Sequence, residues 1–290
     1  MSYRRMREEE KRLKEEARRL LAEAEQADKE EDRRYGRAGR AEDLPAELAR
    51  REERLKRIAA ARQELEQRAR AEDEARKKND DKDKPSGSGR ASGNGREGKP
   101  KADAQHNFTD PESRIMKGQD GFVQAYNAQI AVEPALGLIV AQALTQEAND
   151  KSQLLPMIDA VKRQSGQKAR EVLADSGYCS EQNLREASIS IDLYVATGKQ
   201  KHNQSAPPAP RGPVPKSATA VERMQRKLRT EAGRAIYATR KTIVEPVFGH
   251  IKQGRGFRQF LLRGVEKVRA EWALVCATHN VLKLYRACTG

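Results

Sequence analysis

The stretch Val172–Ser180 reads VLADSGYCS, and it decides how the second half of the chain is interpreted. A short apolar run ends in a bare aspartate, Asp175, and a glycine follows two residues later. A buried strand normally avoids charge, so this carboxylate either caps the next turn or is a functional group held at the edge of a sheet. Both interpretations place Asp175 at the C-terminal tip of a β-strand.

The composition indicates a small core and an anionic partner. Of the 290 residues 34% are charged and 37% apolar, which allows a compact unit of about 150 residues. The net charge is +14, and most of the excess lies between Arg223 and Arg269, where the acidic residues are only Glu231, Glu245 and Glu266. Concentrated Lys and Arg residues favour a polyanion such as DNA.

Several protein classes are excluded by what the sequence lacks. It has no apolar run of the ~18 residues that cross a membrane and no signal-peptide pattern, which predicts a cytoplasmic protein. Its three cysteines form no CxxC pair, and its four histidines have no paired zinc-ligand spacing. Nucleotide-binding and hydrolase motifs are also missing.

Residues 1–78 are predicted to form a helical hairpin arm. Apolar residues recur at helical spacing from Met6 in a charged background, and a second such stripe begins after Asp43 and Pro45, which suit an N-cap and a first helical turn. Two stripes joined by a short loop bury each other. The sequence favours an intramolecular arm, and a dimerising coiled coil, and hence a homodimer, is the alternative.

Residues 79–106 hold no apolar residue larger than alanine and are predicted to be a flexible linker. Residues 107–290 are richer in apolar residues. Apolar and polar residues alternate in two segments, 122–133 and 138–145, which predicts a hairpin, and predicted helices alternate with further apolar runs after them. A capping-box-like start is predicted at Asp150 and Gln153. The order predicts an α/β domain with a mixed sheet, interrupted by a polar excursion at about 199–218.

Two carboxylates are candidates for metal-dependent phosphodiester chemistry. Such chemistry needs oxygen ligands for Mg²⁺ on rigid elements, and Asp175 at a strand tip meets that need. Glu245, beside the most basic segment and directly before Pro246, is predicted at a helix start or a kink and could close the site. The plainer alternatives are a cap for Asp175 and an ion pair with a nearby arginine for Glu245.

Basic and aromatic residues near Glu245 are predicted to bind DNA. Lys252 follows Glu245 by two helical turns, and Phe257 and Phe260 offer rings for stacking on an unpaired base. The predicted DNA-binding residues are Tyr237, Arg240, Lys241, Lys252, Arg255, Arg258 and Arg263.

Four stretches together resemble the DDE transposases of bacterial insertion sequences: NFTDPESRIMKGQDGFVQAYNAQIAV, then VLADSGYCS, then RKTIVEPVFGHIKQGRGFRQFLLRGVEKVRAEW, and finally HNVLKL. The resemblance covers nearly the whole chain. It implies an RNase H-like catalytic domain, Mg²⁺ or Mn²⁺ as cofactor, Asp175 as the second catalytic aspartate and Glu245 as the catalytic glutamate. It also implies a bacterial, nucleoid-associated protein that binds insertion-sequence ends and target DNA.

The sequence departs from this family at its first aspartate. The family carries that residue in an Asp-Gly-Thr strand just before the helical arm, whereas here Met1 already begins the arm. The resemblance therefore implies an N-terminally truncated copy, inactive if nothing replaces the missing first strand. Asp110 is the candidate replacement, although Asp-Pro more often opens a turn.

The leading hypothesis is a transposase catalytic region that cuts and rejoins DNA by two-metal phosphoryl transfer. The alternative from another class is a non-catalytic DNA-binding or scaffolding protein that uses the basic segment and the arm. A third alternative is a relic that does not fold stably.

Overall fold

The computed structural model describes residues 1–35, 44–82, 98–118, 121–198 and 212–289. It consists of two compact units, Met1–Pro111 and Glu112–Gly290. Each unit has its own hydrophobic core.

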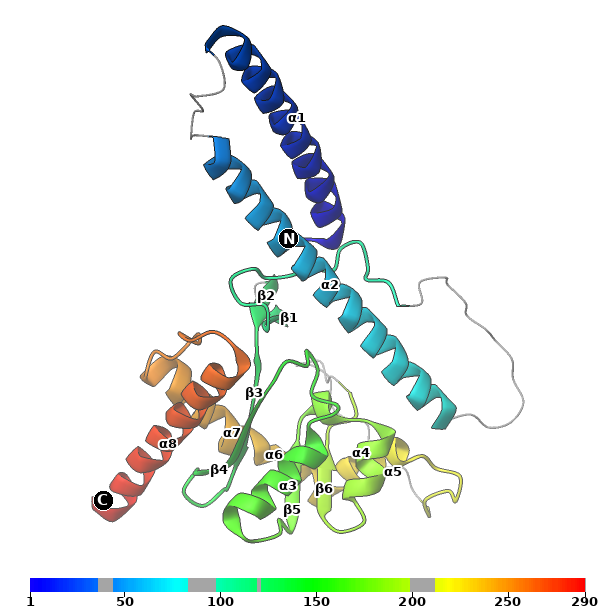
Figure 1. The fold of residues 1–290 in the computed structure, drawn as a ribbon. Helices are drawn as coiled ribbons and strands as arrows, with labels where there is room; N and C mark the ends of the chain where they lie inside the picture. The colour runs from blue at the N-terminus through cyan, green and yellow to red at the C-terminus, as the bar shows by residue number, and fades with distance from the viewer. Residues whose placement is uncertain (36–43, 83–97, 119–120, 199–211, 290) are drawn as a thin grey trace. The chain divides into compact units, whose positions relative to one another are not determined.

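The first unit is built on two long helices, α1 (Tyr3–Tyr35) and α2 (Leu44–Lys82), which run in opposite directions (Figure 1). Charged residues dominate both helices, and an apolar stripe on each is buried against the other. The buried side chains between them are Met6, Leu13, Ile58, Ala61 and Leu65. The predicted N-cap, Asp43, lies outside the described residues.

The predicted linker differs from the structure at both ends. Residues 79–82 belong to α2, and residues 98–106 contact the helical hairpin through backbone hydrogen bonds. The Tyr3 N–H, for example, donates to the Ala104 carbonyl at 2.7 Å. A polar segment can be held without apolar side chains when its backbone groups find partners in this way. Residues 83–97 lie outside the described residues.

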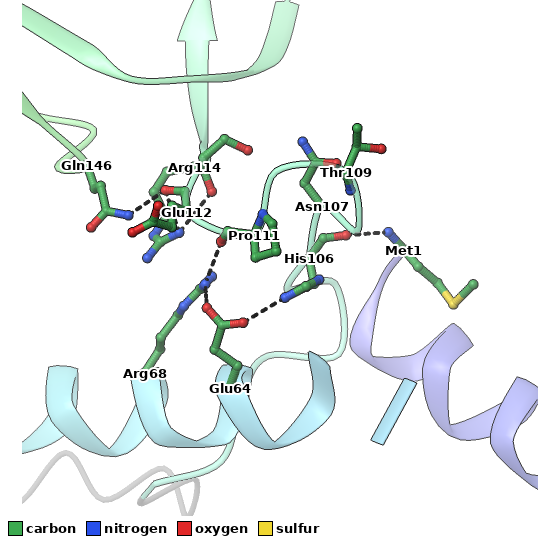
Figure 2. A network of polar contacts seen from close by, with 11 residues as sticks. Met1, Glu64, Arg68, His106, Asn107, Thr109, Pro111, Glu112, Arg114 and Gln146 are labelled. Carbon is green, nitrogen blue, oxygen red and sulfur yellow. Dashed lines mark hydrogen bonds and ion pairs between the residues drawn. The ribbon is translucent and has the colours of Figure 1, made fainter. Parts of the chain in front are cut away.

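A buried histidine fastens the end of that segment to α2 (Figure 2). The His106 ring is nearly buried, and its Nε2 lies 2.9 Å from the Glu64 carboxylate. Burial by itself would raise the pKa of Glu64, but His106 and Arg68 outweigh it and hold this pKa below its usual range. Arg68 also donates to the Pro111 carbonyl at 2.7 Å, and the Met1 amino group donates to the His106 carbonyl at 2.8 Å.

The second unit contains three two-stranded ladders. Two are antiparallel, β1 with β2 and β3 with β4, and the third, β5 with β6, is parallel. The strands are β1 (Arg114–Gly118), β2 (Gly121–Ala125), β3 (Asn127–Val132), β4 (Ile139–Thr145), β5 (Glu171–Ala174) and β6 (Asp192–Val195). The mixed α/β class is as predicted, with parallel and antiparallel pairs in one unit.

The prediction of a single mixed sheet is wrong, because the described strands form three separate two-stranded ladders. Among the described residues, β3 pairs only with β4, and β5 pairs only with β6. Side chains connect the two ladders instead, because the Tyr178 hydroxyl, just after β5, donates to the Gln129 side chain on β3. The predicted strand 122–133 is also divided: its first half pairs with β1 and its second half with β4.

Helices cover these ladders and form two main cores. Their bounds are α3 (Leu154–Ser165), α4 (Glu181–Ala187), α5 (Ala220–Arg229), α6 (Glu231–Ala238), α7 (Arg240–Gly249) and α8 (Val265–Thr289), with a π-helical turn at His250–Gly254. One core joins β3 and β4 to α7 and α8 around Trp272. The other surrounds β5 and β6 and is centred on Leu184, Leu193 and Val195. The short strand that carries Asp175 is therefore anchored in a packed core.

The predicted capping box at Asp150 and Gln153 is wrong. Helix α3 begins at Leu154, and its N-cap Gln153 makes no capping hydrogen bond through its side chain. The Asp150 carboxylate is unavailable as a cap because it accepts hydrogen bonds from side chains of β3. These hydrogen bonds hold the Asp150 carboxylate close to Gly177, in the turn after β5.

Candidate active site

Asp175 stands at the tip of β5, where the sequence predicts it. The strand ends at Ala174, and Asp175 caps the 3₁₀ turn Ser176–Tyr178. Its Oδ1 accepts a hydrogen bond from the Gly177 N–H at 2.8 Å. No hydrogen bond or ion pair from the residues that the structure describes engages its other oxygen, Oδ2. One oxygen thus serves the turn and the second remains for a ligand.

A second carboxylate, Asp150, lies against the same turn. A Cβ atom built on Gly177 would lie 2.7 Å from Oδ2 of Asp150 and 3.0 Å from Oδ1 of Asp175. The two carboxylate oxygens are therefore no further apart than the sum of these distances. A side chain at position 177 would crowd both acids, so glycine lets the two carboxylates approach the turn. Asp150 is a site residue that sequence reasoning missed.

A buried glutamine, Gln129, connects Asp150 to Tyr178 in the turn after Asp175. Oδ1 of Asp150 accepts hydrogen bonds from Asn127 Nδ2 and Gln129 Nε2, both at 2.7 Å. Gln129 is only 3% exposed, and its Oε1 accepts the hydrogen bond from the Tyr178 hydroxyl. Burial raises the pKa of Tyr178, and the negative charges of Asp150 and Asp175 raise it further, so the phenol stays protonated and donates.

A series of contacts leads from Asp175 to Glu245. The Tyr237 hydroxyl donates to the carbonyl of Ala174 at 3.2 Å, one residue before Asp175. The Arg240 guanidinium lies 5.9 Å from the centre of the Tyr237 ring, and its Nη2 is 3.7 Å from Glu245 Oε1. Burial raises the pKa of Tyr237, an effect that Arg240 opposes and Asp175 reinforces. The structure thus connects four of the predicted site residues.

The prediction that Glu245 lies at a helix start is wrong, and the alternative of a kink before Pro246 stays a prediction. Glu245 lies inside α7, and Pro246 follows it within the same helix. Proline has no N–H to donate, so the helix tolerates it at the cost of one hydrogen bond. The Glu245 side chain is 59% exposed, and its ion pair with Arg240 is the structural role that the sequence also allowed.

Two of the predicted DNA-binding arginines have structural partners. Arg255 donates to the Val275 carbonyl at 3.0 Å and to the Thr278 hydroxyl at 2.6 Å, both on α8. Arg258 donates to the Gln253 side chain. These contacts fix the loop between the π-helical turn and α8, and they leave the arginines with fewer N–H groups for phosphates.

Among the other basic residues predicted to bind DNA, Lys241, Lys252 and Arg263 are exposed, whereas Arg240 is paired with Glu245. The Lys252 ammonium lies 5.3 Å from the Phe248 ring centre. Arg240 is largely buried, and its Nε has no hydrogen-bond partner among the described residues. One guanidinium N–H therefore remains unused beside the site.

Phe257 and Phe260, the rings predicted to stack on an unpaired base, pack in part against the core, and the stacking stays a prediction. Both rings pack against the core around Trp272. The Phe260 ring meets the Trp272 ring edge to face, with 6.1 Å between ring centres. It meets the Phe257 ring in the same way, at 6.0 Å. Their buried apolar surface stabilises the core, and each residue remains partly exposed.

The carboxylates of the candidate site are of the kind that binds a divalent cation, but only two of them lie together in the ranges that the structure describes. Carboxylate oxygens are the ligands that Mg²⁺ prefers, and the Asp150–Asp175 pair supplies two such groups at one turn. In the described part of the chain, no three His, Cys, Asp or Glu side chains come close enough to hold a metal together. Asp110 belongs to the first unit and is 9% exposed, so its role as the replacement aspartate stays a prediction.

Comparison with known families identifies the segment that contains Glu245. Residues 213–285 match a family model described as the transposase DDE domain. Over these residues the chain is similar to that family. Searches of curated proteins and of solved structures each returned no match. No helix in the described ranges is long and apolar enough to span a bilayer.

The transposase segment carries part of the candidate site. It includes Glu245 and all seven predicted DNA-binding residues, and it runs from the loop before α5 almost to the end of α8. Asp150 and Asp175 precede it and reach it through the Tyr237 hydrogen bond at the end of β5. The match covers about a quarter of the chain and does not include Asp150 or Asp175.

Replacement of Gly177 by alanine tests whether the acid pair matters. The added Cβ would overlap Asp150 and crowd Asp175, so we expect nicking activity to fall by about 10-fold or more through displacement of the carboxylates. Stability should change by less than about 1 kcal/mol, because the carboxylates are side-chain ends that can move. Gly249→Ala is the matched control, since nothing lies within 4 Å of the position that its added Cβ would take. Equal activity of both variants would contradict a role for the pair.

Proposed function

We propose that the second unit is the catalytic region of an insertion-sequence transposase that cleaves and rejoins DNA by metal-assisted phosphoryl transfer. The observation that supports this most is the position of Asp175. Its carboxylate stands at the tip of β5 beside Asp150, and contacts through Tyr237 and Arg240 connect it to Glu245 in the transposase segment.

The chemistry follows from these groups. Water or a 3′-hydroxyl attacks phosphorus, a new P–O bond forms, and the bond to the leaving oxygen breaks. Asp175 and Asp150 would hold Mg²⁺ or Mn²⁺ with Glu245, and the bound ion would stabilise the charge on the attacking and leaving oxygens. The proton of the attacking hydroxyl would pass to solvent, and the leaving oxygen would remain as an alkoxide or take a proton from solvent.

The phosphate groups would be oriented by the cations of the same segment. Arg240 has a buried N–H without a partner among the described residues, and Lys252 is exposed on the following π-helical turn. Charge-assisted hydrogen bonds from such groups to phosphate oxygens are strong and directional. The partners proposed are the ends of the insertion sequence and its target DNA, in the bacterial nucleoid.

One observation favours a second candidate function, a non-catalytic DNA-binding protein. No three metal-binding side chains converge in the described residues, and Glu245 is paired with Arg240. A chain without a complete set of acids would keep its basic surface and its affinity for DNA. Its binding would fall steeply with salt and would need no metal.

Metal removal separates the two functions. The purified chain is incubated with supercoiled plasmid and Mg²⁺ or Mn²⁺, with an excess of EDTA as the control. We expect nicked product with either metal and none with EDTA, because the carboxylates need the ion to act on phosphorus. Filter binding in the same buffers should show DNA bound in both. Salt-sensitive binding without nicking in any buffer would favour the non-catalytic function.

A further inference from the structure

A basic groove lies within the first unit, away from the residues of the candidate site in sequence. It has a volume of about 960 Å³ and lies between the start of α1, the middle of α2 and residues 98–102. The cations that line it are Arg4, Arg7, Lys11, Arg62, Arg70 and Lys99, and the acids are only Glu8 and Glu66. Helix α1 as a whole carries as many acidic as basic residues, so the groove gathers positive charge from a balanced surface.

Both acids of the groove are already neutralised. Glu66 accepts a hydrogen bond from the Tyr3 hydroxyl at 2.8 Å and lies 3.5 Å from Arg62. Glu8 lies 3.9 Å from Arg4. Lys11 lies 3.9 Å from Glu15, outside the groove lining. The other three cations, Arg7, Arg70 and Lys99, make no ion pair with any residue that the structure describes. These three cations carry the unbalanced charge of the groove.

Side chains, and not backbone amides, must recognise the ligand here. The first N–H groups of α1 are occupied, since Tyr3 donates to the Ala104 carbonyl at 2.7 Å and Arg4 donates to the Ala102 carbonyl at 3.1 Å. The unpaired cations come from three different segments, α1, α2 and residues 98–102. Cations spread in this way suit several phosphates along a polymer better than a single small anion.

The lining also argues against a protein partner. It contains no leucine, isoleucine, valine, methionine or phenylalanine among the described residues, and Tyr3 is the one aromatic residue among them in that lining. Protein interfaces are normally centred on buried apolar or aromatic anchors, whereas nucleic-acid interfaces are polar and strongly basic. We propose that this groove binds the phosphate backbone of duplex DNA. The proposal does not depend on whether the second unit cleaves DNA.

Charge removal in the full-length chain tests the groove. The groove variant changes its three unpaired cations to glutamine: Arg7→Gln, Arg70→Gln and Lys99→Gln. The control variant removes the same charge from exposed cations of the same two helices that do not line the groove: Arg18→Gln, Arg50→Gln and Lys56→Gln. Affinity for a fluorescent DNA duplex is measured by anisotropy between about 50 and 200 mM salt.

The two variants should separate clearly. We expect the groove variant to bind DNA about 10-fold more weakly and to lower the salt slope by about 2 to 3, because each lost phosphate contact removes about 0.9 from the slope. The control variant should stay within about 2-fold of the original chain, with the same slope. Equal losses in both variants would overturn the proposal, since only general charge would then be acting.

A crosslinking experiment provides a second, independent readout. A photoreactive benzoylphenylalanine placed at Arg7 should crosslink to labelled duplex DNA, and one placed at Lys56 should not. Absence of a crosslink at Arg7, or equal crosslinks at both positions, would overturn the proposal.

Competition tests the choice of duplex DNA as the ligand. If polyglutamate or duplex RNA competes as well as duplex DNA at the same charge concentration, the proposal is overturned. Both readouts are independent of nicking, so failure of the catalytic proposal leaves these results unaffected.

Discussion

Asp175→Asn is expected to lower metal-dependent nicking by about 100-fold or more, because it removes a charge that the divalent ion needs. The fold should survive the change. An asparagine oxygen accepts the Gly177 N–H as the aspartate does, and asparagine caps helical turns as well as aspartate. Affinity for DNA should stay the same or rise, since a negative charge near the phosphates is lost. Plasmid nicking and anisotropy measure the two effects separately.

The matched control is Asp159→Asn. Asp159 is exposed on α3 and carries the same charge, so its replacement should leave nicking within about 2-fold. Asp150→Asn should resemble Asp175→Asn, because the two carboxylates face the same glycine. If nicking by all three variants equals that of the original chain, neither acid takes part in the reaction.

Glu245→Gln distinguishes the third proposed ligand from a structural ion pair. A catalytic glutamate predicts a loss as large as that of Asp175→Asn. A residue that only pairs with Arg240 across 3.7 Å on an exposed surface predicts little change, because exposed ion pairs contribute about 0 to 1 kcal/mol. A large loss for the aspartates and none for Glu245 would restrict the site to the pair at Gly177.

Local pattern was enough to predict the elements that carry the site. The apolar run before Asp175 is strand β5, the alternating segment around Ile130 is β3, and the helix predicted near 265–286 is α8 (Val265–Thr289). Periodicity reports which residues face a core, and each of these elements packs on one side against a core. The strand tip at Asp175 could therefore be found from the sequence.

The partner of Asp175 could not be predicted in the same way. The spacing of Asp150 to Gln153 indicates a helix cap, and local spacing does not report the amide donors that Asn127 and Gln129 offer from β3. The signal that existed is the pair of amides two residues apart on one strand face. One of them, Gln129, is buried and needs polar partners. Contacts between distant segments decide such sites, and a single sequence does not encode them visibly.

Trp272→Ala is expected to destabilise the second unit by about 3 to 5 kcal/mol, the usual result of removing a large buried ring. Trp272 is 3% exposed, its ring lies parallel to Phe248 at 6.4 Å, and Phe260 meets it edge to face. The indole N–H also donates to the Gln129 carbonyl at 3.2 Å, which would lose its partner. Since Trp272 is the only tryptophan, unfolding in urea is followed by circular dichroism.

Two further variants, one on α8 and one at Trp272 itself, test whether the lost stability comes from the buried ring. Tyr285→Ala removes an aromatic ring that is 65% exposed on α8 and should change stability by less than about 0.5 kcal/mol. Trp272→Phe keeps most of the apolar contact and loses the hydrogen bond, so a cost of about 1 to 2 kcal/mol is expected. Equal unfolding midpoints for Trp272→Ala and Tyr285→Ala would contradict the core described here. A cost for Trp272→Phe would locate part of the stability in the bond to Gln129, the residue that also holds Asp150 in place.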